Sequence, residues 1–362
     1  MDKETLCRLI HEAHTDKKRV ALYSCAHVPE EILEAAGFVA IRLSHIDDLS
    51  NGSGITLPSN LCPVVKECCA ALTSDAAAGA DLVLAESSCD GKKKMYELLD
   101  GQEKIYYYQI PQGEDRAYAR PLILSEMAYL RRMFCTHFGA QTDDDRLWKA
   151  IDLCASKRES VMALAAAQKS DPPAAWGMEV YETLIASREI SGQRERTVFL
   201  RAETARLKDR PSPVPADNRR ILLTGCPMQS VYRKIVGAVE RSGGVVVCFE
   251  NCEFVKSHIR CTDRTAGDPM EALADIYQAT ACAIMSPNER RFRLLEELTR
   301  EYRAEGVIDV LLQTCHTYGV EKDRLRRFCA EEDIPYMAVE TADTDADAGQ
   351  LETRIAAFLE ML

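Results

Sequence analysis

Residues 19–43 read RVALYSCAHVPEEILEAAGFVAIRL, and this stretch decides the fold class. An apolar run over 19–24 leads into Cys25, and a second apolar run occupies 38–43. Between them a proline followed by two glutamates marks a helix start, because proline has a helical φ and glutamate stabilises the first turn. A strand, a helix and another strand, with each strand apolar throughout, are typical of a parallel α/β sheet covered on both faces.

The alternation continues and then restarts after a helical stretch. Strands are also expected at 81–87 and 104–110, with helices over 63–80 and 92–100. Helices then fill most of 121–208, and three prolines in RPSPVPADN (210–218) mark a linker. Four further strands are expected at 219–225, 243–250, 306–314 and 334–340, with helices near 229–242, 270–284, 288–304, 320–332 and 348–361. We therefore expect an α/β fold of two Rossmann-like (flavodoxin-like) parallel-sheet domains, 1–140 and 216–362, joined by a mostly helical segment, 141–215.

Composition and net charge disfavour several classes of protein. The chain has 362 residues, of which 46% are hydrophobic and 28% charged, a balance typical of globular proteins. Its 57 acidic and 45 basic residues give a net charge of −12, which disfavours a nucleic-acid or anionic-membrane binder. The charged N-terminus lacks the apolar segment of a secretory signal, and no run is long enough to span a membrane. We expect a cytoplasmic protein.

Fifteen cysteines are the unusual feature of the composition. Structural disulfides are rare in a reducing cytoplasm, so a surplus of cysteine indicates metal ligation or redox chemistry. Some are expected to be ordinary buried residues, namely Cys7, Cys68, Cys69, Cys135, Cys154, Cys248, Cys261 and Cys329. Others lie at or within two residues of the carboxyl end of an expected strand, namely Cys25, Cys89, Cys226, Cys252 and Cys315. Ligands bind at that edge of a parallel sheet, and a helix start that follows a cysteine favours its thiolate.

The spacing of these cysteines repeats between the two halves. Cys25 and Cys89 are 64 residues apart with Cys62 between them. Cys252 and Cys315 are 63 residues apart with Cys282 between them. No CxxC pair occurs, which disfavours a zinc ribbon or a thioredoxin-type site. Three widely spaced thiolates per half suit an iron–sulfur cluster, and a cubane with only three ligands leaves one iron open to a substrate or a second cluster.

Other motifs in the sequence give weaker indications of function. SSCDGKKK does not satisfy the phosphate-binding P-loop pattern, so no nucleotide site is expected on this chain. Its lysines, Lys92, Lys93 and Lys94, open a helix against the macrodipole. They form either a solvated turn or a patch that balances an anionic cluster or docks a partner. His27, His258 and His316 lie near the cysteines in sequence, but packing histidines are more common than catalytic ones, and no catalytic residue is assigned.

Five blocks together resemble the 2-hydroxyacyl-CoA dehydratase/benzoyl-CoA reductase family. They are YSCAHVPEEILEAAGF, ESSCDGKKKMYELL, CAIMSPNERR, GVIDVLLQTCHTYGVEK and GQLETRIAAFLEML. Within that family the chain looks most similar to the double-cubane cluster proteins. The resemblance implies an 8Fe-9S cluster and low-potential anaerobic reduction of a small, hard-to-reduce substrate. It also implies a separate iron–sulfur ATPase activator as electron donor, and we expect a homodimer that docks it through Lys92, Lys93 and Lys94.

Carried over residue by residue, the resemblance implies six cluster ligands: Cys25, Cys62, Cys89, Cys252, Cys282 and Cys315. ENCEF around Cys252 departs from the family pattern, which leaves Cys226, Cys248 and Cys261 as substitutes. Two alternatives stay open. One is the 4Fe-4S subunit of a 2-hydroxyacyl-CoA dehydratase, which eliminates water by a ketyl-radical mechanism and needs three or four ligands where a bridged pair needs six. The other is a non-catalytic electron-transfer protein.

Overall fold

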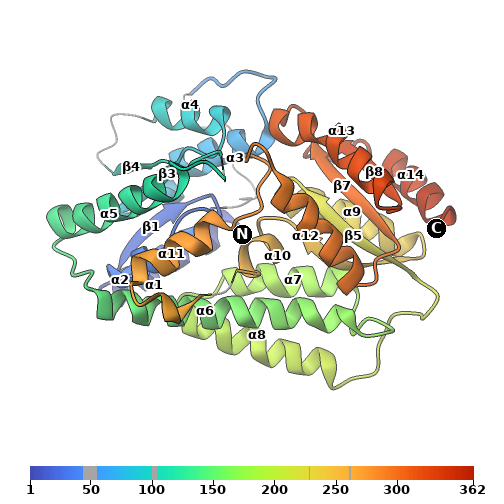
Figure 1. Ribbon diagram of the computed structural model, residues 1–362, viewed down its shortest axis with the longest axis horizontal. Helices are drawn as coiled ribbons and strands as arrows, with labels where there is room; N and C mark the ends of the chain where they lie inside the picture. Colours follow the sequence, from blue (N-terminus) through green and yellow to red (C-terminus); the bar gives the residue numbers. More distant parts are fainter. Residues whose placement is uncertain (44–54, 100–103, 114, 228, 261) are drawn as a thin grey trace.

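The protein forms two four-stranded sheets in which all strands are parallel (Figure 1). The computed structural model describes residues 1–43, 55–99, 104–113, 115–227, 229–260 and 262–362. The first sheet has the order β2-β1-β3-β4 and the second β6-β5-β7-β8, so the two sheets are built alike. Their bounds are β1 Arg19–Tyr23, β2 Phe38–Arg42, β3 Leu82–Glu86, β4 Ile105–Tyr108, β5 Arg219–Gly225, β6 Gly244–Glu250, β7 Gly306–Leu312 and β8 Tyr336–Thr341.

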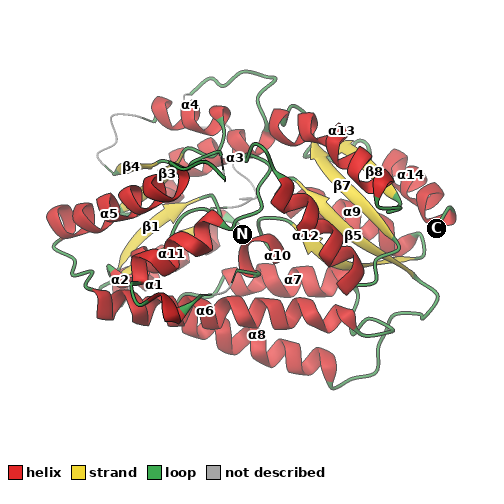
Figure 2. Ribbon diagram, in the orientation of Figure 1, coloured by secondary structure: helices red, strands yellow, loops and turns green. Residues whose placement is uncertain are grey.

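Helices cover both faces of each sheet (Figure 2). Every residue of β3, β6 and β7 is buried, as expected for strands sandwiched between helices. The helices of the first half are α1 Lys3–Thr15, α2 Glu30–Ala35, α3 Pro63–Thr73, α4 Asp90–Leu98, α5 Ala119–Phe138, α6 Asp144–Ala166, α7 Gly177–Arg188 and α8 Gln193–Lys208. Those after the linker are α9 Gln229–Arg241, α10 Val255–His258, α11 Pro269–Gln278, α12 Glu289–Glu301, α13 His316–Glu331 and α14 Ala348–Glu360.

Helices α6 and α8 run beneath both sheets and join them (Figure 1). The chain also crosses between the halves at α11, which lies beside α5 on the side of the first sheet (Figure 1). Leu273 and Ile276 of α11 share one apolar core with Tyr23 of β1, and Arg120 of α5 pairs with Glu271. The second half of the sequence therefore completes the core of the first.

The fold class and all eight strands agree with the sequence expectations. Two helices, α1 and α10, were not expected, and α13 begins at His316 rather than near residue 320. Asp2 caps α1 by accepting a hydrogen bond from the Thr5 amide at 2.7 Å. This capping residue indicates a helix start, but it lies among several other charged residues and was not used to predict one. The domain bounds 1–140, 141–215 and 216–362 stay a prediction. Within the described residues, no helix combines the length and apolarity needed to cross a membrane.

Candidate metal centre

Five of the six cysteines singled out from the sequence lie at strand ends or helix starts, and the sixth lies in a loop. Cys25 and Cys252 each follow the last residue of a strand, β1 and β6, by two positions. Cys62, Cys89 and Cys315 are the N-terminal cap residues of α3, α4 and α13. Cys282 lies in the loop between α11 and α12. These positions place thiols where helix N-termini favour negative charge.

One set of thiols, which we call the Cys252 group, consists of Cys25, Cys252 and Cys282. Cys252 and Cys282 are buried, 8% and 7% exposed, and Cys282 donates a hydrogen bond to Cys252. Cys25 lies close enough for its charge to interact with both of them. The group therefore joins one cysteine of the first half to two of the second.

A second set, the Cys315 group, consists of Cys62, Cys89, Cys226 and Cys315. Cys62 donates a hydrogen bond to Cys315, and Cys315 donates in turn to Cys226. Cys89 lies near Cys62: burial raises the pKa of the Cys89 thiol, and the charge of Cys62 adds to that rise. This group also mixes both halves of the chain, so each group bridges the two sheets.

The Cys252 group is poised to hold a thiolate. The hydrogen bond from Cys282, together with the positive charges of Lys256 and Arg42, lowers the pKa of Cys252 to about 5. The donor, Cys282, has a pKa well above the usual value because of the same bond. Burial raises the pKa of Cys25 to about 12, so this thiol stays protonated until something replaces its proton.

Two cationic side chains, one buried and one half-buried, lie near these thiols. Lys256 is 1% exposed, lies 3.0 Å from Glu250 and donates to the Tyr318 hydroxyl at 3.2 Å. Arg42 donates through Nη1 to the carbonyl oxygen of Cys252 at 2.6 Å. Positive charge fixed near several thiolates favours a bound group of net negative charge, such as a thiolate-ligated iron–sulfur cluster. The donor set and its charges therefore fit such a cluster.

Lys92 corrects one expectation. It is 7% exposed and points inward, donating to Glu86 and to the Ser24 hydroxyl, each at 2.5 Å. The prediction that Lys92 contacts a partner at the surface was therefore wrong, because its ammonium group is buried in an ion pair with the carboxylate of Glu86. Lys93 and Lys94 are exposed. The positive charge of Lys92, which is unfavourable at the N-terminus of α4, is thus balanced by Glu86 at the end of β3.

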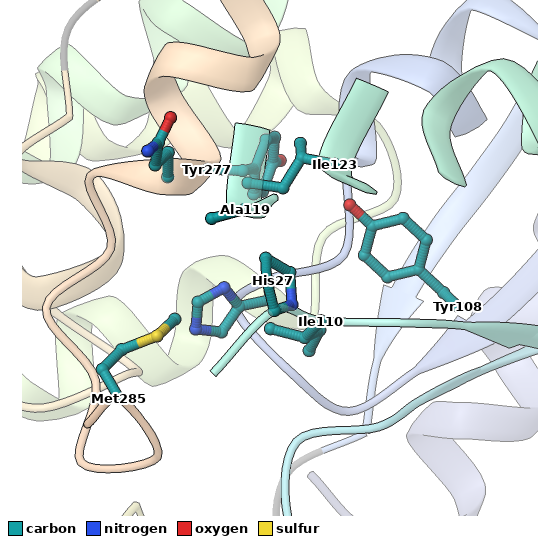
Figure 3. A pocket seen from close by; sticks show the side chains of 9 residues that line it. His27, Tyr108, Ile110, Ala119, Ile123, Tyr277 and Met285 are labelled. Carbon is teal, nitrogen blue, oxygen red and sulfur yellow. The ribbon is translucent and has the colours of Figure 1, made fainter. Parts of the chain in front are cut away.

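His27 lines a small closed cavity next to the Cys252 group. It lies among the side chains of Tyr108, Tyr277 and Met285 (Figure 3). The cavity of about 10 Å³ has room for one water molecule. His27 is 3% exposed, and its Nε2 has no hydrogen-bond partner among the described residues. Burial and the nearby charge of Arg260 lower its pKa to about 3, which keeps the imidazole neutral.

A larger groove opens beside Cys89. Its volume is about 560 Å³, and both halves line it, through Cys89 and Gln112 on one side and Asn288, His316 and Arg324 on the other. A concave site of this size, lined mostly by polar side chains, can admit a small polar molecule. The third histidine, His258, is remote from this groove and donates through Nδ1 to the Phe254 carbonyl at 2.6 Å.

The remaining cysteines divide by burial. Cys248 is enclosed within β6, and Cys226 lies in the Cys315 group. Cys261 lies outside the described residues. Burial was expected for most of the ordinary cysteines; Cys68, Cys69, Cys154, Cys248 and Cys329 are buried, and Cys7 and Cys135 are exposed. Across the part of the chain that the structure describes, no three His, Cys, Asp or Glu side chains converge as metal ligands would.

Sequence reasoning missed Arg42, Lys256 and the role of Cys226 beside Cys315. Arg42 ends a strand and Lys256 follows ENCEF, but nothing in the pattern predicts that they turn toward thiols. The signal that could have been used is the spacing of Glu86 to Lys92 and of Glu250 to Lys256. Each pair is six residues apart and flanks a candidate cysteine.

Comparison with known proteins places the chain among enzyme subunits. The family model for 2-hydroxyglutaryl-CoA dehydratase, D-component, matches residues 25–362. The protein named "Putative dehydratase subunit YjiM" of Escherichia coli (strain K12) is 36% identical over 349 residues, covering 93% of this chain and 90% of the relative. A benzoyl-CoA reductase subunit of Thauera aromatica is 22% identical, covering 99% and 94%. The (R)-phenyllactyl-CoA dehydratase beta subunit of Clostridium sporogenes is 19% identical, covering 97% and 94%.

Proposed function

The chain belongs to the 2-hydroxyglutaryl-CoA dehydratase D-component family of enzymes, and we propose that it acts as an iron–sulfur reductase. The cofactor we propose is a double-cubane 8Fe-9S cluster held by Cys25, Cys62, Cys89, Cys252, Cys282 and Cys315. The substrate is a small, hard-to-reduce molecule. Electrons come from a separate iron–sulfur ATPase, the activator.

One observation supports this proposal above others: seven thiols fall into two groups whose members interact through hydrogen bonds or through their charges, and each group draws on both halves. A single cubane takes about four protein ligands, so a site with more thiols than that suits a bridged pair. Cys226 adds one thiol beyond the six implied by the resemblance, and it is the nearest replacement should Cys315 or Cys62 not ligate.

When bound, the cluster supplies electrons of low potential. The protein's own part is to hold the ligands and balance their charge. Cys252 is already disposed to be a thiolate, and Lys256 and Arg42 offset its charge. The other thiols must release protons on binding, so cluster uptake is coupled to pH. The groove beside Cys89 gives a small molecule a route from solvent to the ligands.

A second candidate follows from the names of the relatives, which are subunits of dehydratases and of a reductase. In that case the chain is the 4Fe-4S subunit of a 2-hydroxyacyl-CoA dehydratase, which eliminates water by a ketyl-radical mechanism. Only one group of cysteines would then hold metal, and activity would need a sister subunit.

The remaining proposals concern assembly. We propose a cytoplasmic homodimer, with the activator docking near the groove and contacting Lys93 and Lys94, which are exposed at the start of α4. We also keep the division into 1–140, 141–215 and 216–362, with the metal centre between the first and last parts.

The test is the iron and acid-labile sulfide content of anaerobically purified protein. About eight irons per chain, reduced by both Cys252→Ala and Cys315→Ala, supports the double cubane. About four irons, reduced by variants of one group only, supports the second candidate, the dehydratase. Cys7→Ala is the matched control, because Cys7 is exposed on α1, away from both groups. Absence of iron from protein purified without oxygen would overturn both.

A further inference from the structure

An enclosed cavity of about 40 Å³ lies on the other side of Arg42 from the Cys252 group. Its walls come from β1, β2, α2, α6, α7, α8 and α10. Four cationic side chains line it, namely Arg42, Lys157, Arg188 and Arg196, against the single carboxylate of Glu30. Nothing in the proposed reaction uses this cavity.

Two of the cations have carboxylate partners. Lys157, 8% exposed, forms an ion pair with Glu30, which also accepts a hydrogen bond from the Tyr23 hydroxyl. Arg188 lies 3.4 Å from a carboxylate oxygen of Glu253 and donates to the Glu253 carbonyl at 2.9 Å. These pairs are neutral overall, so Arg196 is left without a carboxylate partner of its own, and Arg42 shares its charge only with the Cys252 thiolate.

Arg42 and Arg196 donate only to backbone carbonyl oxygens. Arg196 bonds the carbonyls of Ile190 at 2.7 Å and of Arg188 at 3.4 Å, and it is 9% exposed. Within the described residues no carboxylate pairs with either guanidinium. Burial lowers the pKa of Arg196 in spite of the opposing charge of Glu30. Arg196 is buried and Arg42 half-buried. A buried guanidinium without a carboxylate partner is costly, and two guanidinium groups that line one cavity can bind an anion between them.

We propose that this cavity binds a small oxyanion, of the size of phosphate or a carboxylate group, between the guanidinium groups of Arg42 and Arg196. The cavity exceeds the space that one water molecule needs. Guanidinium groups present paired N–H donors that match the oxygens of phosphate and carboxylate better than a spherical halide. The bound anion would tie α8 to β2 and, through Arg42, to the backbone of Cys252. The site needs no cluster to form, so it does not rest on the proposed function.

The experiment measures anion binding to the anaerobically purified protein with whatever metal it carries. Inorganic phosphate and sodium acetate are titrated in separate arms at an ionic strength held constant with sodium chloride. Calorimetry gives the affinity, and thermal unfolding gives the shift in midpoint. We expect a midpoint that rises with one of the two anions, because a ligand that binds only the folded state stabilises it. The arm that responds tells phosphate from carboxylate.

The variants separate the site from general salt effects. Arg196→Gln is expected to weaken binding at least about tenfold, since it removes a charge-assisted bond. Arg196→Lys keeps the charge and should retain part of the affinity. Arg201→Gln is the control, because Arg201 lies on the same helix but is exposed and contacts Ser156. If the wild type responds to neither anion, or if Arg196→Gln binds as tightly as Arg201→Gln, the site does not exist.

Discussion

Cys62 of the first half donates a hydrogen bond to Cys315 of the second. Each is the cap residue of a helix, α3 and α13, so the bond brings two helix N-termini together. Helix N-termini carry partial positive charge and repel each other unless something negative lies between them. The pair is therefore a natural place for ligands shared between the two sheets.

Removing the metal should loosen this contact. Anaerobic chelation is expected to lower the unfolding midpoint by at least about 4 °C, corresponding to more than 1 kcal/mol, because ligand binding contributes to folding free energy. Hydrogen exchange should quicken at the starts of α3 and α13 and stay unchanged in α14, which contacts neither group. An unchanged midpoint after complete iron loss would contradict the proposal that metal links the halves.

Lys256→Met should destabilise the protein by about 3 kcal/mol or more, because it removes the close cation from the buried carboxylate of Glu250 and leaves it the Thr224 hydroxyl and the more distant Arg291. The double variant Lys256→Met/Glu250→Gln should recover part of the loss. Denaturant unfolding measures both. Lys208→Met, at the exposed end of α8, is the control and should change stability little. Equal losses in the single and double variants would show that the pair is not coupled.

Charge reversal at Lys93 and Lys94 should slow electron transfer from the activator, because exposed charges act mainly on association rate. Iron content should not change, since neither side chain reaches the cysteines. The rate of reduction by the activator is followed at several salt concentrations, and the effect should shrink as salt rises. Lys208→Glu provides the same charge change elsewhere. A rate equal to that of this control would remove Lys93 and Lys94 from the docking surface.

Acid should destabilise the metal-free protein through Glu31. Burial acts to raise the pKa of this carboxyl, but the charge of Arg158 and hydrogen bonds from Arg158 and Tyr277 outweigh it and leave the pKa lowered. A lowered pKa contributes stability above the unfolded value of about 4.3 that is lost as the pH falls below it. Glu31→Gln should therefore be less stable than the wild type at pH 7, and the difference should narrow toward pH 3. A constant difference across this range would mean that Glu31 does not titrate with folding.

The sequence predicts the strand ends well because each strand of a parallel sheet is apolar throughout and stops where the apolar run stops. It therefore placed Cys25, Cys89 and Cys315 correctly at the edge of a sheet. It could not predict that Cys62 meets Cys315, because that contact depends on how two separate sheets face each other. Nor could it predict the burial of Lys92, since the sequence of a lysine run does not show whether its first side chain points to Glu86 or to solvent.

The crossing of α11 has a consequence for how the protein is made. Tyr277 donates to Glu31 at 2.7 Å, and Leu273 and Ile276 fill the core around β1, so the first sheet lacks part of its interior until α11 arrives. During synthesis, residues of the first half leave the ribosome long before residue 278 does. Domains usually fold in order as they emerge, but this one has to wait for a helix translated after the linker. Until then its apolar face stays open to chaperones, and a ribosome that stalls within the linker leaves a chain unable to close its first core.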